Sequence, residues 1–463
     1  MSDRTATGRP TAPPFSRARL TGLINRERAD YRARHPASAA AFAEAGAHLL
    51  GGVPMTWMRM WPGGFPLYLA TANGSRLTDI DGHEFIDFCL GDTGAMAGHS
   101  PAAVRAAVAS RYDGAGGATT MLPTEDATWV AADLTRRFGA AYWSFTLTAT
   151  DANRWAIRLA RQLTGRPKIL VYNYCYHGSV DETFIVTTPA GPMSRDGNVG
   201  APVDPRQTTR VVEFNDPDAL DRELAHEDVA AVLMEPALTN IGIVLPEPGY
   251  LAAVRTLTRQ HGSLLINDET HTFSAGPGGC TQAWQLEPDI VTIGKSIAGG
   301  IPAGAFGLSA DLADQILHDQ SADIVDTGGV GGTLAGNALS VTAMRATLEH
   351  VLTDAAFDDM IAVADRYTAG VRDVLASRDL PWVITQLGAR AEYRFCPAPP
   401  RNGGESAAAA DSELDEYLHL YLVNRGILLT PFHNMALMSP ASTAGDADAH
   451  ARVFAAAADE LLG

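Results

Sequence analysis

The sequence predicts an α/β fold built on a mainly parallel, doubly wound sheet with helices on both faces. Short apolar or β-branched runs alternate with amphipathic stretches through the middle of the 463-residue chain. Such alternation is typical of parallel β-α-β units. The chain shows no internal repeat and no low-complexity linker, so this length fits one intertwined enzyme.

The expected elements follow from local patterns. Residues 66–88 predict a β-hairpin unit that turns at Asn73-Gly74 and Asp81-Gly82. Residues 151–165 predict a helix, because apolar residues recur there at roughly helical spacing and Gly165 closes the pattern. A second helix is expected over 250–262. Further strands are expected over 143–148, 168–173, 228–237, 263–268, 289–294 and 303–309.

The pattern changes near Thr347. Helix-like stretches there alternate with fewer apolar strands, at 392–397 and 425–431. We therefore expect an N-terminal tail and small-domain segment over 1–99, a large domain over 100–346 and a C-terminal small domain over 347–463. The two outer segments are expected to pack together, so that one small α+β domain is built from both chain ends.

Composition excludes several classes of protein. The net charge of −18 argues against a nucleic-acid or membrane partner, since both favour basic patches. Cys89, Cys175, Cys280 and Cys396 form no C-x-x-C pair, so neither a metal ribbon nor a disulfide framework is predicted and a reducing cytoplasm is expected. The first fifteen or so residues, which lack the apolar core of a signal peptide, are interpreted as a flexible tail. No later stretch approaches a membrane span.

Lys295 lies at the end of an apolar run and before a glycine-rich stretch. The triplet Gly294-Lys295-Ser296 matches the end of a phosphate-binding P-loop, but that motif needs a glycine where this chain has Asp289. A partly desolvated lysine is a nucleophile for carbonyl groups. A snorkelling surface lysine does not fit between two apolar segments.

Two more strand ends carry polar residues. Asp268 follows a buried strand, where a carboxylate needs a cationic partner or else serves as a cap. Thr148, Ala149 and Thr150 follow another strand and precede a helix, so they either hold a phosphate or provide an ordinary N-cap through Thr150 or Asp151. A lysine, a carboxylate and a helix terminus together suit pyridoxal phosphate.

With these residues, the chain resembles the class III, fold-type I pyridoxal-phosphate aminotransferases. The resemblance is to the branch that contains glutamate-1-semialdehyde aminomutase and β-amino-acid aminotransferases. The resemblance covers nearly the whole chain. It is carried by YHG (176–178), MEP (234–236), NDE (267–269), GKSIAGGIPAGAFG (294–307) and GGTLAGN (331–337).

The resemblance implies a role for each matching residue. Lys295 would form the Schiff base and carry a proton, and Asp268 would keep the pyridine nitrogen protonated. Thr333 would reach the phosphate from a partner subunit, which implies a homodimer. The remaining expected cofactor contacts are Ala149, Thr150, Tyr176, His177, Glu235 and Asn240. Arg59, Trp57 and Arg394 are candidates for substrate binding, although each arginine also fits a surface or structural ion pair.

The sequence departs from the family pattern twice. Ala149 replaces a glycine of the phosphate loop, and alanine resists positive φ, so an altered loop is expected. His271 is unusual near the cofactor and is interpreted as a loop histidine rather than a substrate-pocket group.

Three functions fit these residues. The favoured one is a ping-pong transaminase that moves an amino group from an amine or amino acid, preferably a β-amino acid or ω-amine, to a keto acid. The alternative is an aminomutase that moves nitrogen within one molecule. The remote alternative, a non-catalytic binding protein, has no need for both Lys295 and Asp268. Dehydrogenase and serine hydrolase motifs are absent.

Overall fold

The computed structural model describes residues 14–318 and 332–463, so most of the expected N-terminal tail lies outside the described residues. Within the described ranges the central sheet has seven strands. In spatial order they are β4 (Tyr142–Thr146), β12 (Gly304–Leu308), β11 (Ile290–Ile293), β10 (Leu264–Asp268), β9 (Val229–Met234), β5 (Lys168–Tyr172) and β8 (Thr209–Val212).

The central sheet is parallel except at β12. This strand pairs antiparallel with both β11 and β4, whereas the other pairs along the sheet are parallel. Only residues 294–303 connect β11 to β12. A parallel crossover needs a dozen or more residues, so the short link reverses the strand. The predicted α/β class with a mainly parallel sheet is confirmed.

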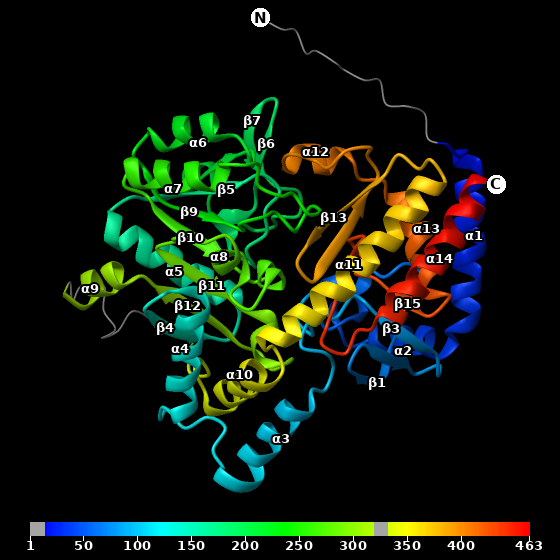
Figure 1. Cartoon of the computed structure of the whole chain (residues 1–463), viewed down its shortest axis with the longest axis horizontal. Coiled ribbons are helices and arrows are strands. Elements are labelled where there is room, and N and C mark those ends of the chain that lie inside the picture. The colour runs from blue at the N-terminus through cyan, green and yellow to red at the C-terminus, as the bar shows by residue number, and fades with distance from the viewer. Residues whose placement is uncertain (1–13, 319–331) are drawn as a thin grey trace, which may run out of the picture.

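Helices cover both faces of this sheet (Figure 1). Along β5, Ile169 and Val171 belong to a buried cluster with residues of α5 (Ala149–Thr164). The alternate residues Leu170 and Tyr172 belong to a second cluster with residues of α6 (Pro217–Leu224) and α7 (Tyr250–Gln260). Because successive strand residues face opposite sides, each face of the sheet has its own apolar core.

The two chain ends meet in a second body, beside the central sheet in Figure 1. β15 (Ile427–Leu428) pairs with β3 (Glu84–Asp87), extending the hairpin of β1 (Leu69–Asn73) and β2 (Arg76–Asp79). A further sheet contains β13 (Val383–Leu387), β14 (Arg390–Arg394) and β16 (Met435–Leu437). We therefore propose that the described residues of segment 1–99, together with 347–463, form one small domain beside the large domain over 100–346.

The other elements connect and cover these sheets. They are α1 (Arg17–Arg34), α2 (Pro36–Ala45), α3 (Ala102–Ser110), α4 (Glu125–Phe138), β6 (Ile185–Thr188), β7 (Gly191–Ser194), α8 (Gly279–Ala283), α9 (Ala310–His318), α10 (Ala338–His350), α11 (Asp354–Ser377), α12 (Gly403–Ala408), α13 (Ser412–Val423) and α14 (Ala444–Leu462). None of the helices in the described ranges has the length and apolar character needed to cross a bilayer.

Candidate active site

A cavity of about 420 Å³ lies at the carboxyl ends of the parallel strands. The residues that follow β4, β9, β10 and β11 all contribute to its wall. In an open α/β sheet this edge is where ligands bind, because the loops begin there. A larger cavity of about 580 Å³ beside α7 contains none of the predicted site residues, so size alone does not identify the site.

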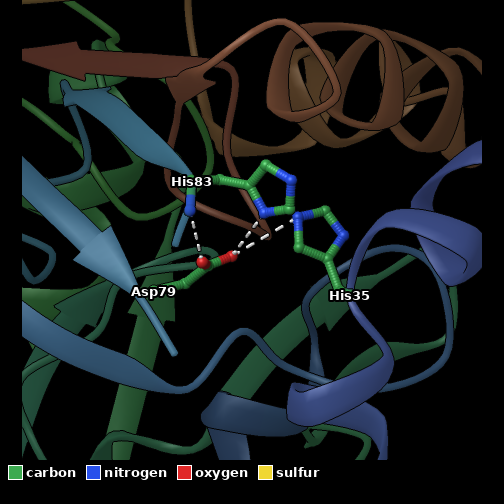
Figure 2. A group of neighbouring side chains, drawn as sticks. All are labelled: His35, Asp79 and His83. Carbon is green, nitrogen blue, oxygen red and sulfur yellow. Dashed lines mark hydrogen bonds and ion pairs between the residues drawn. The ribbon is translucent and has the colours of Figure 1, made fainter. Parts of the chain in front are cut away.

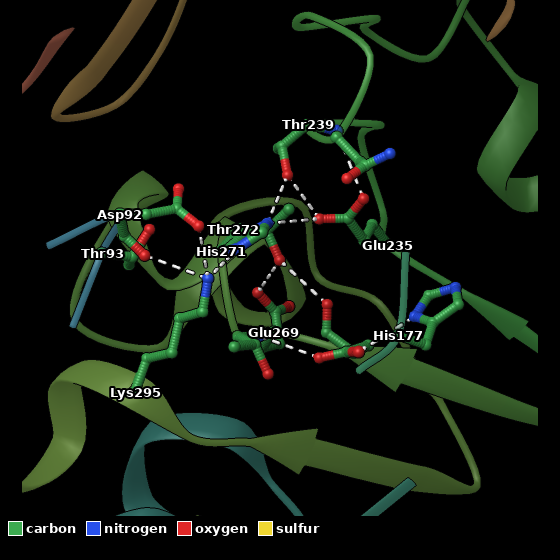
Figure 3. Close-up of polar contacts among 12 residues, drawn as sticks. Asp92, Thr93, His177, Glu235, Thr239, Glu269, His271, Thr272 and Lys295 are labelled. Atoms are coloured by element: carbon green, nitrogen blue, oxygen red, sulfur yellow. Dashed lines mark hydrogen bonds and ion pairs between the residues drawn. The ribbon is translucent and has the colours of Figure 1, made fainter. Parts of the chain in front are cut away.

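Lys295 begins a tight turn directly after β11 and its side chain lines the cavity. Its Nζ lies 2.5 Å from His271 Nε2 and 3.0 Å from both the carbonyl oxygen and Oδ2 of Asp92 (Figure 3). Its φ of 52° is in the left-handed region, which non-glycine residues rarely adopt. Gly294 is required beside it, because an added Cβ would lie 2.9 Å from the Ala149 amide nitrogen.

Asp92, beside Lys295, was not predicted from the sequence. It lies in a loop after β3 in which Leu90, Asp92 and Thr93 all have positive φ, and the side chain of Thr93 accepts a hydrogen bond from the buried Arg390. Burial opposes ionisation of Asp92, but Lys295 and His271 outweigh it and hold the pKa of that carboxyl well below its usual range. Asp92 therefore supplies a fixed negative charge beside the lysine.

His271 is buried and lines the cavity, so its interpretation as a loop histidine is wrong. Burial, reinforced by Lys295, lowers its pKa and keeps the ring neutral. The Thr239 hydroxyl donates to Glu235 Oε1 at 2.5 Å, so it accepts from His271 Nδ1 at 2.8 Å. This fixes the tautomer, since Nε2 then carries the lone pair that faces Lys295 Nζ.

Asp268 ends β10 in a fully buried position. Its Oδ2 accepts from Asn153 Nδ2 at 2.8 Å and from His177 Nδ1 at 2.9 Å, and its Oδ1 accepts from the Thr270 amide at 3.1 Å. Burial opposes ionisation, but His177 and the other donors lower the pKa of Asp268 to about 2. His177 therefore lies behind Asp268 and orients it, rather than lining the cavity.

The amino end of α5 forms another wall of the cavity. Thr148 is its N-cap, accepting from the Asp151 amide at 3.1 Å, so the alternative of a cap by Thr150 or Asp151 is wrong. The amides of Ala149 and Thr150 are first-turn donors without an intrahelical acceptor. Ala149 is helical and has no positive φ, so its replacement of glycine causes no backbone strain.

Glycine is also required at residue 178, where the chain passes close to Thr150. Gly178 has a φ of 79°, and an added Cβ would lie 2.1 Å from Thr150 Oγ1. This leaves the Thr150 hydroxyl to accept from the Ser179 amide at 3.0 Å. The close approach shapes the pocket at the amino end of α5.

Aromatic residues flank the cavity. The rings of Trp57 and Tyr176 lie 5.2 Å apart in an edge-to-face arrangement, and both side chains line it. Glu235 also lines the cavity, whereas Asn240 donates to the Tyr174 carbonyl at 3.0 Å outside it.

The two predicted arginine anchors do not reach the cavity. Arg59 is exposed and packs over Gly51, and Arg394 is buried with its guanidinium donating to the Ser406 carbonyl. Among the described residues, Lys295 is the only Lys or Arg in the cavity wall. Thr333 is exposed and does not line the cavity of its own chain.

Comparison with known proteins identifies the family. The family described as "Aminotransferase class-III" matches residues 60–454. A curated glutamate-1-semialdehyde 2,1-aminomutase of Sorangium cellulosum is 34% identical over 92% of this chain and 97% of that protein.

Solved structures agree. A glutamate-1-semialdehyde-aminomutase from Pseudomonas aeruginosa PAO1 is 49% identical to this chain with a TM-score of 0.94, and the match covers 97% of this chain and 100% of that one. A lysine-to-alanine variant of that aminomutase was solved in complex with PMP. An omega-transaminase from Sphaerobacter thermophilus is 29% identical with a TM-score of 0.85, covering 92% of this chain and 98% of that one. The predicted fold-type I architecture is confirmed, and the chain belongs to the class III aminotransferase family.

Proposed function

We propose that the chain is a pyridoxal-phosphate-dependent aminomutase that moves an amino group between neighbouring carbons of an amino aldehyde resembling glutamate-1-semialdehyde. The observation that carries this proposal is the 49% identity over 97% of the chain to a protein of that name, with a TM-score of 0.94. The aminomutase that the sequence analysis held as its alternative is therefore better supported than the transaminase it favoured.

Pyridoxal phosphate is the cofactor, and the site residues fit it. Lys295 offers an amine for the aldehyde, ionised Asp268 offers a partner for the ring nitrogen, and the first amides of α5 offer a cradle for the phosphate. The group itself supplies an electron-withdrawing ring that stabilises negative charge on the substrate carbon.

The protein residues then position groups and move protons. Asp268 holds a proton on the ring nitrogen because its own pKa lies far below neutral pH. Lys295 Nζ carries protons at the reacting carbons, and the His271 Nε2 lone pair and Asp92 hold that nitrogen in place. Tyr176 and Trp57 exclude water from one side of the cavity.

We also propose a homodimer in which Thr333 completes the partner's phosphate site. Thr333 is exposed on its own chain, which suits contact with a second subunit. The four cysteines are free, which supports a reducing compartment such as the cytoplasm.

A transaminase is the second candidate, supported by the 29% identity to an omega-transaminase. It would use the same residues with an external amine donor and a keto acid acceptor. A non-catalytic binding role is not supported, because the family is enzymatic and both Lys295 and Asp268 are retained.

Turnover without a keto acid distinguishes the two candidates. Purified holoenzyme is incubated with glutamate-1-semialdehyde alone, and 5-aminolevulinate is measured over time. An aminomutase gives many turnovers without an acceptor. Turnover of β-amino acids or ω-amines only when pyruvate or 2-oxoglutarate is added would support the transaminase instead. The cofactor absorbance is followed in parallel, with Lys295→Ala as the inactive control.

A further inference from the structure

His35, Asp79 and His83 form a compact cluster (Figure 2). None of the three lines the active-site cavity. His35 lies between α1 and α2, Asp79 ends β2, and His83 precedes β3. Their nearest ligand-type atoms all lie within 4.8 Å of one another. The cluster thus joins the N-terminal helices to the β2–β3 hairpin.

The facing atoms of this cluster have no hydrogen-bond partner. Asp79 Oδ2 lies 3.4 Å from His35 Nε2 and 3.4 Å from His83 Nδ1, and all three atoms are buried and unpaired. His35 and Asp79 are each 1% exposed. Buried polar atoms without partners are costly and rare, so three that face one another need a common ligand.

The tautomer of His35 also indicates that the cluster needs a bound cation. His35 Nδ1 lies 2.7 Å from the Tyr31 carbonyl oxygen, which can only accept, so Nδ1 carries the hydrogen. In the tautomer that carries this hydrogen on Nδ1, His35 Nε2 directs a lone pair at Asp79 Oδ2, 3.4 Å away, an arrangement that is repulsive unless a cation lies between them.

Two of the three ligand spacings match a tetrahedral metal ion, and the three ligand-type atoms all lie within 4.8 Å of one another. Zinc lies about 2.0–2.1 Å from histidine nitrogen and carboxylate oxygen, so two ligand atoms of a tetrahedral site are about 3.3 Å apart. Both distances from Asp79 Oδ2 are 3.4 Å. We propose that His35 Nε2, Asp79 Oδ2 and His83 Nδ1 bind a zinc-class divalent cation.

The surrounding contacts support such a site. The Tyr31 carbonyl orients His35, and the His83 amide donates to Asp79 Oδ1 at 2.8 Å and orients that carboxylate. Second-shell hydrogen bonds of this kind are usual at metal sites. The nearby Asp81 accepts from the Ala37 amide at 2.7 Å and adds negative charge to offset a divalent cation.

A histidine–aspartate pair in the same sheet region provides a contrast. His99 Nε2 lies 2.7 Å from Asp87 Oδ2 and donates to it directly. That pair satisfies itself and leaves no space for an ion. The 3.4 Å spacing around Asp79 is therefore a property of this cluster and not of such pairs in general.

The site has a structural consequence. The ion would fix the junction of α1 and α2 to the hairpin, and α2 leads to the segment 56–59 that carries Trp57 into the active-site cavity. Removing the ion is expected to lower thermal stability before it affects catalysis.

The test measures metal in untagged, full-length holoenzyme. The protein is stripped with a chelator, offered Zn²⁺ or Co²⁺, desalted and analysed for bound metal per chain, and affinity is obtained by competition with a chromophoric chelator. The variants are His83→Asn, whose side chain is partly exposed, and Asp79→Asn, which keeps an acceptor for the His83 amide. His48→Gln, an exposed histidine of the same region, is the matched control.

We expect one ion per chain in the wild type and in His48→Gln, and affinity weaker by on the order of 100-fold in both cluster variants. The Co²⁺ form should show a visible tetrahedral band that His83→Asn abolishes. Zn²⁺ should raise the melting temperature of the wild type and of His48→Gln, and not that of the two cluster variants. Retained cofactor absorbance shows that a variant is folded. The proposal is overturned if stripped wild type takes up none of Zn²⁺, Co²⁺, Ni²⁺ or Fe²⁺, or if folded His83→Asn binds them equally well.

Discussion

Replacing Asp268 with asparagine should destabilise the protein and weaken cofactor binding together. The pKa of Asp268 falls from 3.8 to about 2 on folding, so at about 1.4 kcal/mol per pH unit its ionised form contributes about 2 kcal/mol at neutral pH. Asparagine also directs an amide donor at Asn153 Nδ2 or His177 Nδ1, both of which donate in the wild type. The buried donor left without an acceptor adds about 1–3 kcal/mol to the loss in the free energy of unfolding. We expect a total loss in the free energy of unfolding of about 3–5 kcal/mol.

The assay is denaturant unfolding of the cofactor-free protein at pH 7, followed by spectrophotometric titration with pyridoxal phosphate. Loss of a charge-assisted hydrogen bond, worth about 1.5–3 kcal/mol, should weaken cofactor affinity about 10- to 150-fold.

Asp289→Asn is the matched control. Asp289 begins the stretch that leads into β11, and its carboxylate pairs with Arg255 at 2.7 Å outside the cavity. This variant should lose stability while keeping cofactor affinity. Wild-type affinity in Asp268→Asn would refute the role assigned to that carboxylate.

Three further outcomes are expected. Burial opposes protonation of His177, but Cys175 and Asp268 outweigh it and raise the pKa of His177 to about 10. The contribution of His177 to stability is therefore complete below about pH 6.5 and is lost as the pH rises through about 10. His177→Gln should remove this alkaline dependence of the unfolding midpoint. His271→Phe removes the Nε2 acceptor of Lys295 and should reduce turnover about 10- to 150-fold, whereas His271→Gln should restore part of that rate. If His271→Phe and the wild type react at equal rates in stopped-flow assays, the positioning role of His271 is contradicted. Dimers mixed from Thr333→Ala and Lys295→Ala chains should contain one intact site if Thr333 acts across the interface, and a rate no higher than that of Thr333→Ala would place the threonine in its own chain's site.

Sequence patterns identified the residues at strand ends. Lys295, Asp268 and the Thr148–Thr150 turn lie at the ends of apolar strands, and parallel topology brings such positions to one edge. Local patterns and the fold class suffice to expect this, and the structure brings these positions to the wall of one cavity. Glu235 was expected only from the family resemblance.

Residues placed by tertiary packing were not predictable in this way. Asp92 reaches Lys295 from a loop more than two hundred residues away in sequence, through backbone conformations with positive φ that no periodicity signals. Asn153 lies on a buried helix face whose pattern indicates only core packing. The two arginine candidates failed for the same reason, because a local motif does not reveal whether a guanidinium faces the cavity or a backbone carbonyl.

Borohydride reduction of the holoenzyme followed by peptide mass spectrometry tests whether Lys295 is the residue that binds pyridoxal phosphate covalently. The chain contains only two lysines, Lys168 and Lys295, and Lys168 is paired with Asp228 at 3.2 Å. We expect one pyridoxyl group per chain on Lys295, unchanged in Lys168→Arg and absent from Lys295→Ala. A label on Lys168, or a wild-type protein with no stable label after saturation with pyridoxal phosphate, would contradict it.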